Sequence, residues 1–266
     1  MLRTFSRLLF LSCLTLFLLG SSSLQAEVED LNTQMLRATV KLSHSDSTGT
    51  GFILTPDQGK NFLLVTANHV LDKTTGNETT IIFRSKVAEG EYKKLPTKLS
   101  IRKDEKALWT KHPSEDVAVI AVTPPEGADL ALVSTDLLAT DEELRQTHVH
   151  PGKQIVFLGY PHREEASEAG FPILRDGPIA TFPLLPTQKT KTFYVSSDIF
   201  SGDSGGPVYT SRPDSTAPMI MGVVHGQRFV HNTVKGDYIT VKTHHQFGLA
   251  IVVHASFIIE TIGLMK

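Results

Sequence analysis

Short apolar runs separated by turn-forming residues recur along most of the chain. Each run spans four to seven residues, is rich in Val, Ile, Leu and Phe, and lacks the 3.6-residue period of an amphipathic helix. The runs begin at Ala38, Gly51, Phe62, Thr80, Val117, Ile155, Thr192, Met219 and Phe247. Regularly spaced short strands with turn signals between them predict an all-β sandwich or barrel.

Three segments depart from this pattern. The last apolar positions, between residues 255 and 262, recur at helical spacing and predict a short closing helix. A polar connection from Thr123 to Gly152 contains Pro, Gly and an acidic cluster, which indicates a surface segment between two strand-rich halves. The charged stretch from Arg84 to Lys111 is interpreted as an exposed hairpin.

The N-terminus has the features of a secretory signal peptide. Arg3 and Arg7 precede an apolar stretch that is too short to span a bilayer, and small residues follow it. We predict that residues 1–26 are the signal, with cleavage after Ala26, or alternatively after Ser23. The expected location is therefore secreted or periplasmic.

Composition narrows the possible partners and the sources of stability. Cys13 is the one cysteine of 266 residues and lies inside the predicted signal, so no disulfide is expected in the mature protein. About 240 residues remain, enough to bury one large β core or two small ones. The net charge of −2 and the lack of a polybasic block argue against nucleic-acid and membrane partners.

The stretch SDIFSGDSGGP, from Ser197 to Pro207, surrounds Ser204 with turn-forming residues. It is either an ordinary polar turn or a support for a reactive hydroxyl, which would need a base and a group to orient that base. His69 follows an apolar strand in TANHV, and Asp116 precedes the apolar run VAVIAV, where an unpaired carboxylate would be costly. Glu115 should point to the opposite face.

The motifs TANHV, DVAVI and GDSGGPV, in this order, resemble the chymotrypsin-like serine proteases. The segments GTGFIL, GKQIVFLGYP, DGPIAT and FGLAI are similar to the bacterial HtrA-type, trypsin-like branch, and the resemblance covers Gly49 to about Ile262. It implies two six-stranded antiparallel barrels, residues 27–145 with His69 and Asp116, and residues 146–266 with Ser204. The active site would lie in the cleft between them.

The resemblance also implies a chemistry. Ser204 would be the nucleophile of a serine endopeptidase, His69 its general base, and Asp116 the group that orients the imidazole. The N–H groups of Gly202 and Ser204 would form an oxyanion hole, and Gly205 and Gly206 would leave room for the substrate. The reaction passes through an acyl-enzyme, and we expect no cofactor and no metal.

Specificity is expected to reside in residues on either side of Ser204. Asp198 matches the position where trypsin-type enzymes bind Lys or Arg, or else it is a solvent-facing loop residue. His225, through its backbone, and Gly226 are expected to pair with an extended peptide substrate. The chain has no Ile-Val-Gly-Gly-like activation terminus, so Asp203 needs another partner, and no PDZ domain is expected after the second barrel.

Two other functions use the same residues. A protease-fold protein that binds peptides without cleaving them differs only in the geometry at Ser204. An esterase with the same triad is less consistent with the strand that follows Ser204, which suits peptide pairing. The pairs His148 and His150, and His244 and His245, lack a Cys, Asp or Glu at ligand spacing, so a surface metal site is not expected there.

Overall fold

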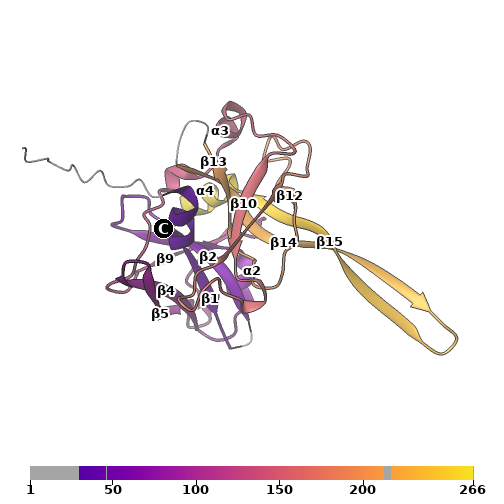
Figure 1. The fold of residues 1–266 in the computed structure, drawn as a ribbon, viewed down its shortest axis with the longest axis horizontal. Helices are drawn as coiled ribbons and strands as arrows, with labels where there is room; N and C mark the ends of the chain where they lie inside the picture. The colour runs from indigo at the N-terminus through magenta and orange to yellow at the C-terminus, as the bar shows by residue number, and fades with distance from the viewer. Residues whose placement is uncertain (1–29, 46, 213–216, 266) are drawn as a thin grey trace, which may run out of the picture.

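The structure, a computed structural model, describes residues 30–45, 47–212 and 217–265 (Figure 1). The predicted signal peptide, its cleavage site and Cys13 lie outside these residues. Strands are the main secondary structure of the described chain, and nearly all of them lie in two curled antiparallel sheets, which confirms the all-β, chymotrypsin-like fold class. Among the described residues no helix is both long and apolar enough to cross a membrane.

The first sheet has seven strands in the order β5-β4-β1-β2-β3-β9-β8. They are β1 (Thr39–Ser43), β2 (Thr48–Leu54), β3 (Phe62–Thr66), β4 (Glu78–Ala88), β5 (Glu91–Ser100), β8 (Thr110–Lys111) and β9 (Ala118–Val122). The short strands β6 (Arg102–Lys103) and β7 (Lys106–Ala107) pair only with each other. The helix α2 (Asn68–Asp72) follows β3 directly, so the end of a central strand leads into the residue His69.

The second sheet has six strands in the order β11-β10-β13-β14-β15-β12. They are β10 (Gln154–Gly159), β11 (Ile173–Pro178), β12 (Thr192–Ser196), β13 (Pro207–Ser211), β14 (Pro218–Lys235) and β15 (Thr240–His254). The outer parts of β14 and β15 extend beyond the sheet as a two-stranded ribbon, drawn in yellow and orange in Figure 1. We call residues 228–247 the arm.

The side chains of β2 point alternately into two hydrophobic cores, one of which is shared by the two sheets. Phe52 and Leu54 point into a large core shared with the second sheet, whereas Ile53 points into a smaller core inside the first. Successive side chains of a strand face opposite ways, so a strand that is apolar throughout is buried on both faces. The central strands of the first sheet are therefore held from both sides, which fixes the position of the turns at their ends.

The helices pack at the margins of the sheets. The predicted closing helix is confirmed as α4 (Ala255–Gly263), which packs against β9 and β14. α1 (Leu31–Ala38) precedes β1, and the connection between the sheets contains a short 3-10 turn, η1 (Thr135–Leu137). A second 3-10 turn, η2 (Pro161–Arg163), follows β10 within the second sheet. The connection between the sheets also holds α3 (Asp141–Gln146), in which Thr140 and Glu143 form a capping box.

The expected exposed hairpin is only partly exposed. Strands β4 and β5 do form a hairpin, and β5 is largely solvated. Arg84, however, is 1% exposed, and its guanidinium donates to the carbonyls of Leu36, Arg37, Thr39 and Gly170. A buried cation is tolerated where carbonyl oxygens surround it, so this charged residue serves packing rather than solvation.

His254, at the end of β15, makes stability depend on pH. The side chain is 1% exposed against Phe193, and burial lowers the pKa of His254 to about 4. The unfolded chain binds the proton with a pKa near 6.5, so the pH-dependent cost of His254 is absent above that pH and grows as the pH falls from 6.5 to 4. The loss amounts to about 3 kcal/mol at the acid end.

We therefore expect His254→Leu to lose less of its free energy of unfolding than the wild type between pH 7 and pH 4.5. Urea denaturation at both pH values measures the difference. His150→Leu is the matched control, because His150 is exposed and its removal should leave the wild-type pH dependence in place. Identical pH dependence in wild type and His254→Leu would contradict this assignment.

Candidate active site

His69, which follows β3, and Asp116, which precedes β9, are joined by two hydrogen bonds. The ring Nδ1 of His69 lies 2.6 Å from Asp116 Oδ2, and the His69 backbone N–H donates to Asp116 Oδ1 at 2.9 Å. Glu115 lies outside this pair and forms an ion pair with Lys191. The carboxylate is therefore fixed by both the main chain and the side chain of the same histidine.

These bonds determine the protonation of both groups. Burial of Asp116 opposes ionisation, but hydrogen bonds from His225 and His69 outweigh it and hold the pKa of this carboxyl well below its usual range. An ionised carboxylate can only accept, so His69 carries its proton on Nδ1. The lone pair on Nε2 is then free to take a proton from another group.

Ser204 lies at the same cavity as His69. The cavity has a volume of about 210 Å³, and Gly202 also lines it. The Ser204 hydroxyl donates to the His225 carbonyl oxygen at 3.3 Å, and within the described residues it has no hydrogen bond to His69. The structure thus brings the three predicted residues to one site, with the hydroxyl in an orientation that must rotate before it can bond to the imidazole.

A buried ion pair supports the turn that carries Ser204. Asp203 is 0% exposed, pairs with Arg175 on β11, and accepts the Phe200 N–H at 2.7 Å. Burial raises the pKa of the Asp203 carboxyl, and Arg175 opposes that rise. Arg175 is the partner that the sequence left unidentified. It follows Leu174 in a short strand, and nothing in that pattern marks it.

The peptide orientations in the turn leave two N–H groups free. The Ser201 carbonyl accepts the His162 N–H at 2.7 Å, and the Asp203 carbonyl accepts the Gly206 N–H at 3.0 Å. In a trans peptide the N–H points opposite to the carbonyl, so the N–H groups of Gly202 and Ser204 point away from these partners. Neither has an acceptor within the described residues, which leaves both available to an external oxygen.

Thr50 on β2 attaches this turn to the first sheet. Its N–H donates to the Ser204 carbonyl at 2.9 Å, and its hydroxyl donates to the Gly202 carbonyl at 2.7 Å. Gly202 has a φ of +104°, and a Cβ there would lie 2.1 Å from the Tyr160 carbonyl oxygen. A larger residue at Gly202 would therefore displace the turn.

The expectation that Gly205 and Gly206 make room for substrate is wrong. A Cβ at Gly205 would lie 2.0 Å from the Thr50 carbonyl oxygen, and one at Gly206 would lie 2.0 Å from the Leu158 carbonyl oxygen. The space beside both glycines is filled by the protein's own backbone. Their absent side chains allow the strands of the two sheets to approach the turn closely.

His225 has a contact that the sequence did not predict. Its ring Nδ1 lies 2.6 Å from Asp116 Oδ2, the same oxygen that His69 contacts, and the two imidazole rings meet edge to face at 5.9 Å. The side chain is 41% exposed, and the backbone role assigned to His225 stays a prediction. A Cβ on the neighbouring Gly226 would meet nothing within 4 Å, so space is open beside this strand.

Asp198 is exposed rather than buried at the floor of a pocket. Its backbone carbonyl accepts from Arg175 Nη1 at 3.2 Å, and its carboxylate lies near Gly248 on β15. An exposed carboxylate is better screened and selects a cation less strongly than a buried one. Its place in substrate selection stays a prediction.

His69, Asp116 and His225 are the one group of three ligand-type residues that lie close together in the described part of the chain. Their ligand atoms lie within 4.8 Å of one another. Both ring nitrogens, however, approach a single carboxylate oxygen at 2.6 Å, whereas ligands around tetrahedral zinc are about 3.3 Å apart. The arrangement fits hydrogen bonding better than metal coordination.

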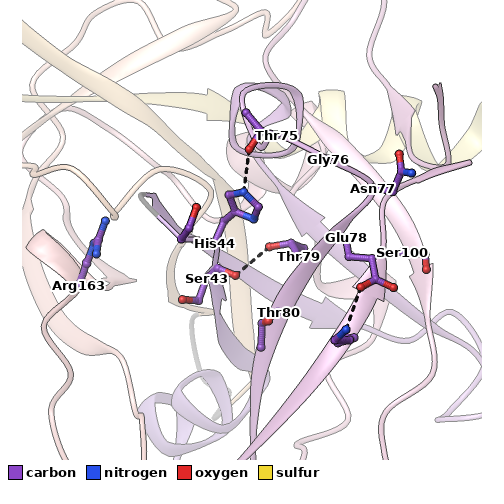
Figure 2. Close-up of a pocket in the computed structure, with 12 residues that line it drawn as sticks. Ser43, His44, Thr75, Gly76, Asn77, Glu78, Thr79, Thr80, Ser100 and Arg163 are labelled. Carbon is purple, nitrogen blue, oxygen red and sulfur yellow. Dashed lines mark hydrogen bonds and ion pairs between the residues drawn. The ribbon is translucent and has the colours of Figure 1, made fainter.

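A second, larger cavity lies beside the first (Figure 2). Its volume is about 840 Å³, and it shares His44 and Thr79 with the smaller one. His44 Nε2 contacts the Thr75 hydroxyl at 2.9 Å, and the Thr79 hydroxyl donates to the Ser43 carbonyl at 3.2 Å. All of its lining residues except Gly76 have polar side chains, so it offers many hydrogen-bonding groups to a bound molecule.

Comparison with known proteins found one matching family model and similar solved structures. The family model "Trypsin-like peptidase domain" matches residues 49–213, which include His69, Asp116 and Ser204. The solved structure of the Rv3671c protease in an inactive form aligns with 87% of this chain and 90% of its own, at 18% identity and a TM-score of 0.49. An inactive serine-to-alanine mutant of Rv3671c from M. tuberculosis H37Rv aligns over 87% of both chains, at 18% identity and a TM-score of 0.47. No curated protein matches the chain.

Removal of Arg175 should destabilise the fold, because it leaves the Asp203 carboxylate buried without a cation. We expect Arg175→Met to lower the free energy of unfolding by about 3 kcal/mol, measured by urea denaturation. The double variant Arg175→Met, Asp203→Asn should recover part of this loss, because the uncompensated charge is gone. Arg145→Met, on the exposed face of α3, is the control, and an equal loss there would refute the assignment.

Loss of the His225 imidazole should raise the pKa of Asp116. In His225→Ala the carboxylate keeps its bonds to His69 but loses one of its donors, so its pKa moves up toward the usual value. Carbon-detected NMR titration of the Asp116 carboxyl measures the shift. His225→Asn retains a side-chain N–H donor and should show a smaller rise; equal pKa values in all three proteins would exclude the hydrogen bond.

Proposed function

The chain belongs to the trypsin-like peptidase domain family, and from this premise we propose that it is a serine endopeptidase that cleaves peptide bonds at Ser204. The observation that carries the proposal is the shared cavity of His69 and Ser204, with Asp116 hydrogen-bonded behind the imidazole. A base with a fixed tautomer beside a hydroxyl is the arrangement that nucleophilic acyl transfer requires.

In the proposed reaction the Ser204 hydroxyl turns from the His225 carbonyl toward His69 Nε2. Its oxygen attacks the carbonyl carbon of the scissile bond while the proton passes to Nε2, and Asp116 stabilises the imidazolium that forms. The negative oxygen of the tetrahedral intermediate accepts hydrogen bonds from the N–H groups of Gly202 and Ser204. Each such donor is typically worth about 2.7–4 kcal/mol of barrier.

The intermediate then collapses with cleavage of the C–N bond. His69 gives its proton to the departing amine, and the acyl group stays on Ser204 as an ester. Water attacks the ester and gives a proton to His69, which passes a proton to the Ser204 oxygen as the ester bond breaks. This releases the carboxylic acid and restores the free serine. The protein's own groups provide every proton transfer, so the proposed reaction calls for no cofactor.

The open space at Gly226 and the backbone of His225 support a peptide as substrate. An extended peptide that pairs with this part of β14 would present its carbonyl to Ser204. We also propose that the enzyme acts in a secreted or periplasmic location, on the basis of the signal-like N-terminus and the single cysteine at Cys13.

A fluorophosphonate probe tests the proposal, because it reacts with activated serines only. Wild-type protein purified without the signal should be labelled, and Ser204→Ala should not be labelled. His69→Ala should lose about 10,000-fold or more in peptidase kcat/KM, with circular dichroism unchanged. Ser211→Ala, at the exposed end of β13, is the control and should be labelled as the wild type is.

The outcomes separate the functions. Labelling that persists in Ser204→Ala would remove Ser204 as the nucleophile. A folded wild-type protein that is never labelled, yet binds peptides, would instead fit the protease-fold binding protein.

A further inference from the structure

One edge of β14 lacks a strand partner over most of its length. On one side, β14 pairs with β15 from Gly222 to Lys235. On the other side it pairs with β13 only from Pro218 to Val223, and the backbone of Val224 then bonds with Gly205 and Gly206. From His225 to Lys235, no described strand covers this edge. Its outward N–H and C=O groups are therefore available for pairing with another chain.

The open edge begins at the candidate nucleophile. The His225 carbonyl lies 3.3 Å from the Ser204 hydroxyl, and Gly226 next to it faces open space. The edge then continues along the arm to Lys235, a run of about 35 Å at the rise of an antiparallel strand. The peptide-pairing part of the proposed active site and the arm thus belong to one strand, β14 (Figure 1). Its register with β15 shifts between Val224 and Gly226 and again between Gln227 and Phe229, so the edge bends where it enters the arm.

The arm is held at its base and carries exposed apolar side chains among polar ones. Arg228 donates from Nε and Nη2 to the Tyr194 hydroxyl, at 3.0 and 2.7 Å, which ties the ribbon to β12. Exposed apolar side chains then occur on both faces of the ribbon, namely Phe229, Val230, Val234, Val241 and Phe247. An isolated two-stranded ribbon is marginally stable in water, and an exposed apolar edge strand invites the addition of a further strand.

Strand direction determines which part of a substrate could lie there. β14 runs away from Ser204 as it enters the arm, so an antiparallel partner runs toward Ser204. The residues of a substrate that precede its scissile bond would therefore lie along the arm. Only a chain with free backbone groups can pair in this way, which selects unfolded or extended polypeptide over a folded domain.

We propose that the free edge of β14, from His225 to Lys235, binds the part of a polypeptide substrate that precedes the scissile bond, as an added antiparallel strand longer than four residues. The substrate class is extended, unfolded polypeptide whose alternate side chains are apolar, because these would pack on Val230 and Val234. The inference rests on the proposed function for its orientation, but peptide binding tests it without any turnover.

The first experiment measures binding to Ser204→Ala by fluorescence anisotropy, with the N-terminal signal residues removed. The probes are peptides that share one cleavage-site sequence and carry four, six, eight or ten residues before it, with valine at alternate positions. Affinity should increase about 10-fold between the shortest and the longest, equivalent to about 1.4 kcal/mol. Equal affinity at all lengths would overturn the proposal.

A second set of probes tests the strand geometry. In the ten-residue peptide, each amide is N-methylated in turn, which removes one N–H donor at a time. Neighbouring N–H groups of a strand point to opposite edges, so affinity should fall at every second position, including positions more than four residues before the cleavage site. Uniform loss, or loss confined to the first four positions, would exclude pairing along the arm.

Matched variants locate the effect. Val230→Ser together with Val234→Ser should reduce the ratio of long-peptide to short-peptide affinity. Val87→Ser changes a valine on the β4–β5 hairpin whose exposure, 52%, lies between those of Val230 and Val234, and it should leave this ratio at the wild-type value. A ratio that is unchanged in the arm variant, or reduced in both, contradicts the proposal.

The two proposals fail in different ways. If the wild type is not labelled by the fluorophosphonate but longer peptides still bind more tightly, the peptidase proposal fails and the arm remains a peptide-binding edge. If the wild type is labelled but peptide affinity does not change with peptide length, the peptidase proposal stands and the binding role of the arm is refuted. If two copies of the protein instead paired through their arms, sedimentation would show a dimer. Peptide affinity would then not increase with peptide length, and this result would also overturn the inference.

Discussion

A carboxylate that is fully buried beneath the turn of Ser204 constrains the rest of the site. Desolvation of Asp203 is costly, and the cost is offset only if Arg175 and the Phe200 N–H stay in contact with it. That requirement fixes the backbone from Phe200 to Gly206. The same backbone presents the Gly202 and Ser204 N–H groups outward. The free N–H groups are thus a consequence of a charge buried behind them.

A second carboxylate links the two sheets. The Asp116 carboxylate accepts hydrogen bonds from His69, on the helix α2 that follows β3 of the first sheet, and from His225, on β14 of the second sheet. Thr50 adds a further link, because it donates to carbonyls on both sides of Asp203. Each sheet alone therefore lacks part of the site, and the orientation of the His69 imidazole depends on how the sheets meet. The open edge of β14 extends from this same junction into the arm.

Local pattern predicted the strands well and the helices less completely. Every apolar run overlaps a strand to within one residue at its ends, since strands buried on one or both faces need continuous or alternating apolar residues. The closing helix was also predicted. Helix α3 was not, although the capping-box residues Thr140 and Glu143 mark its start. Arg84 looked like part of a solvated face because its four carbonyl partners come from segments distant in sequence.

The sequence by itself determined the all-β class and the family, and it identified His69, Asp116 and Ser204 as candidate residues, because these inferences depend on local periodicity and on short motifs. Only the tertiary structure decided that Arg175 pairs with Asp203, that His225 shares Asp116, and that Gly205 and Gly206 pack against the protein's own backbone. It also decided that β14 runs on as a free edge. These contacts join residues far apart in the chain, and their energies come from burial and charge pairing that exist only once the two sheets have packed together.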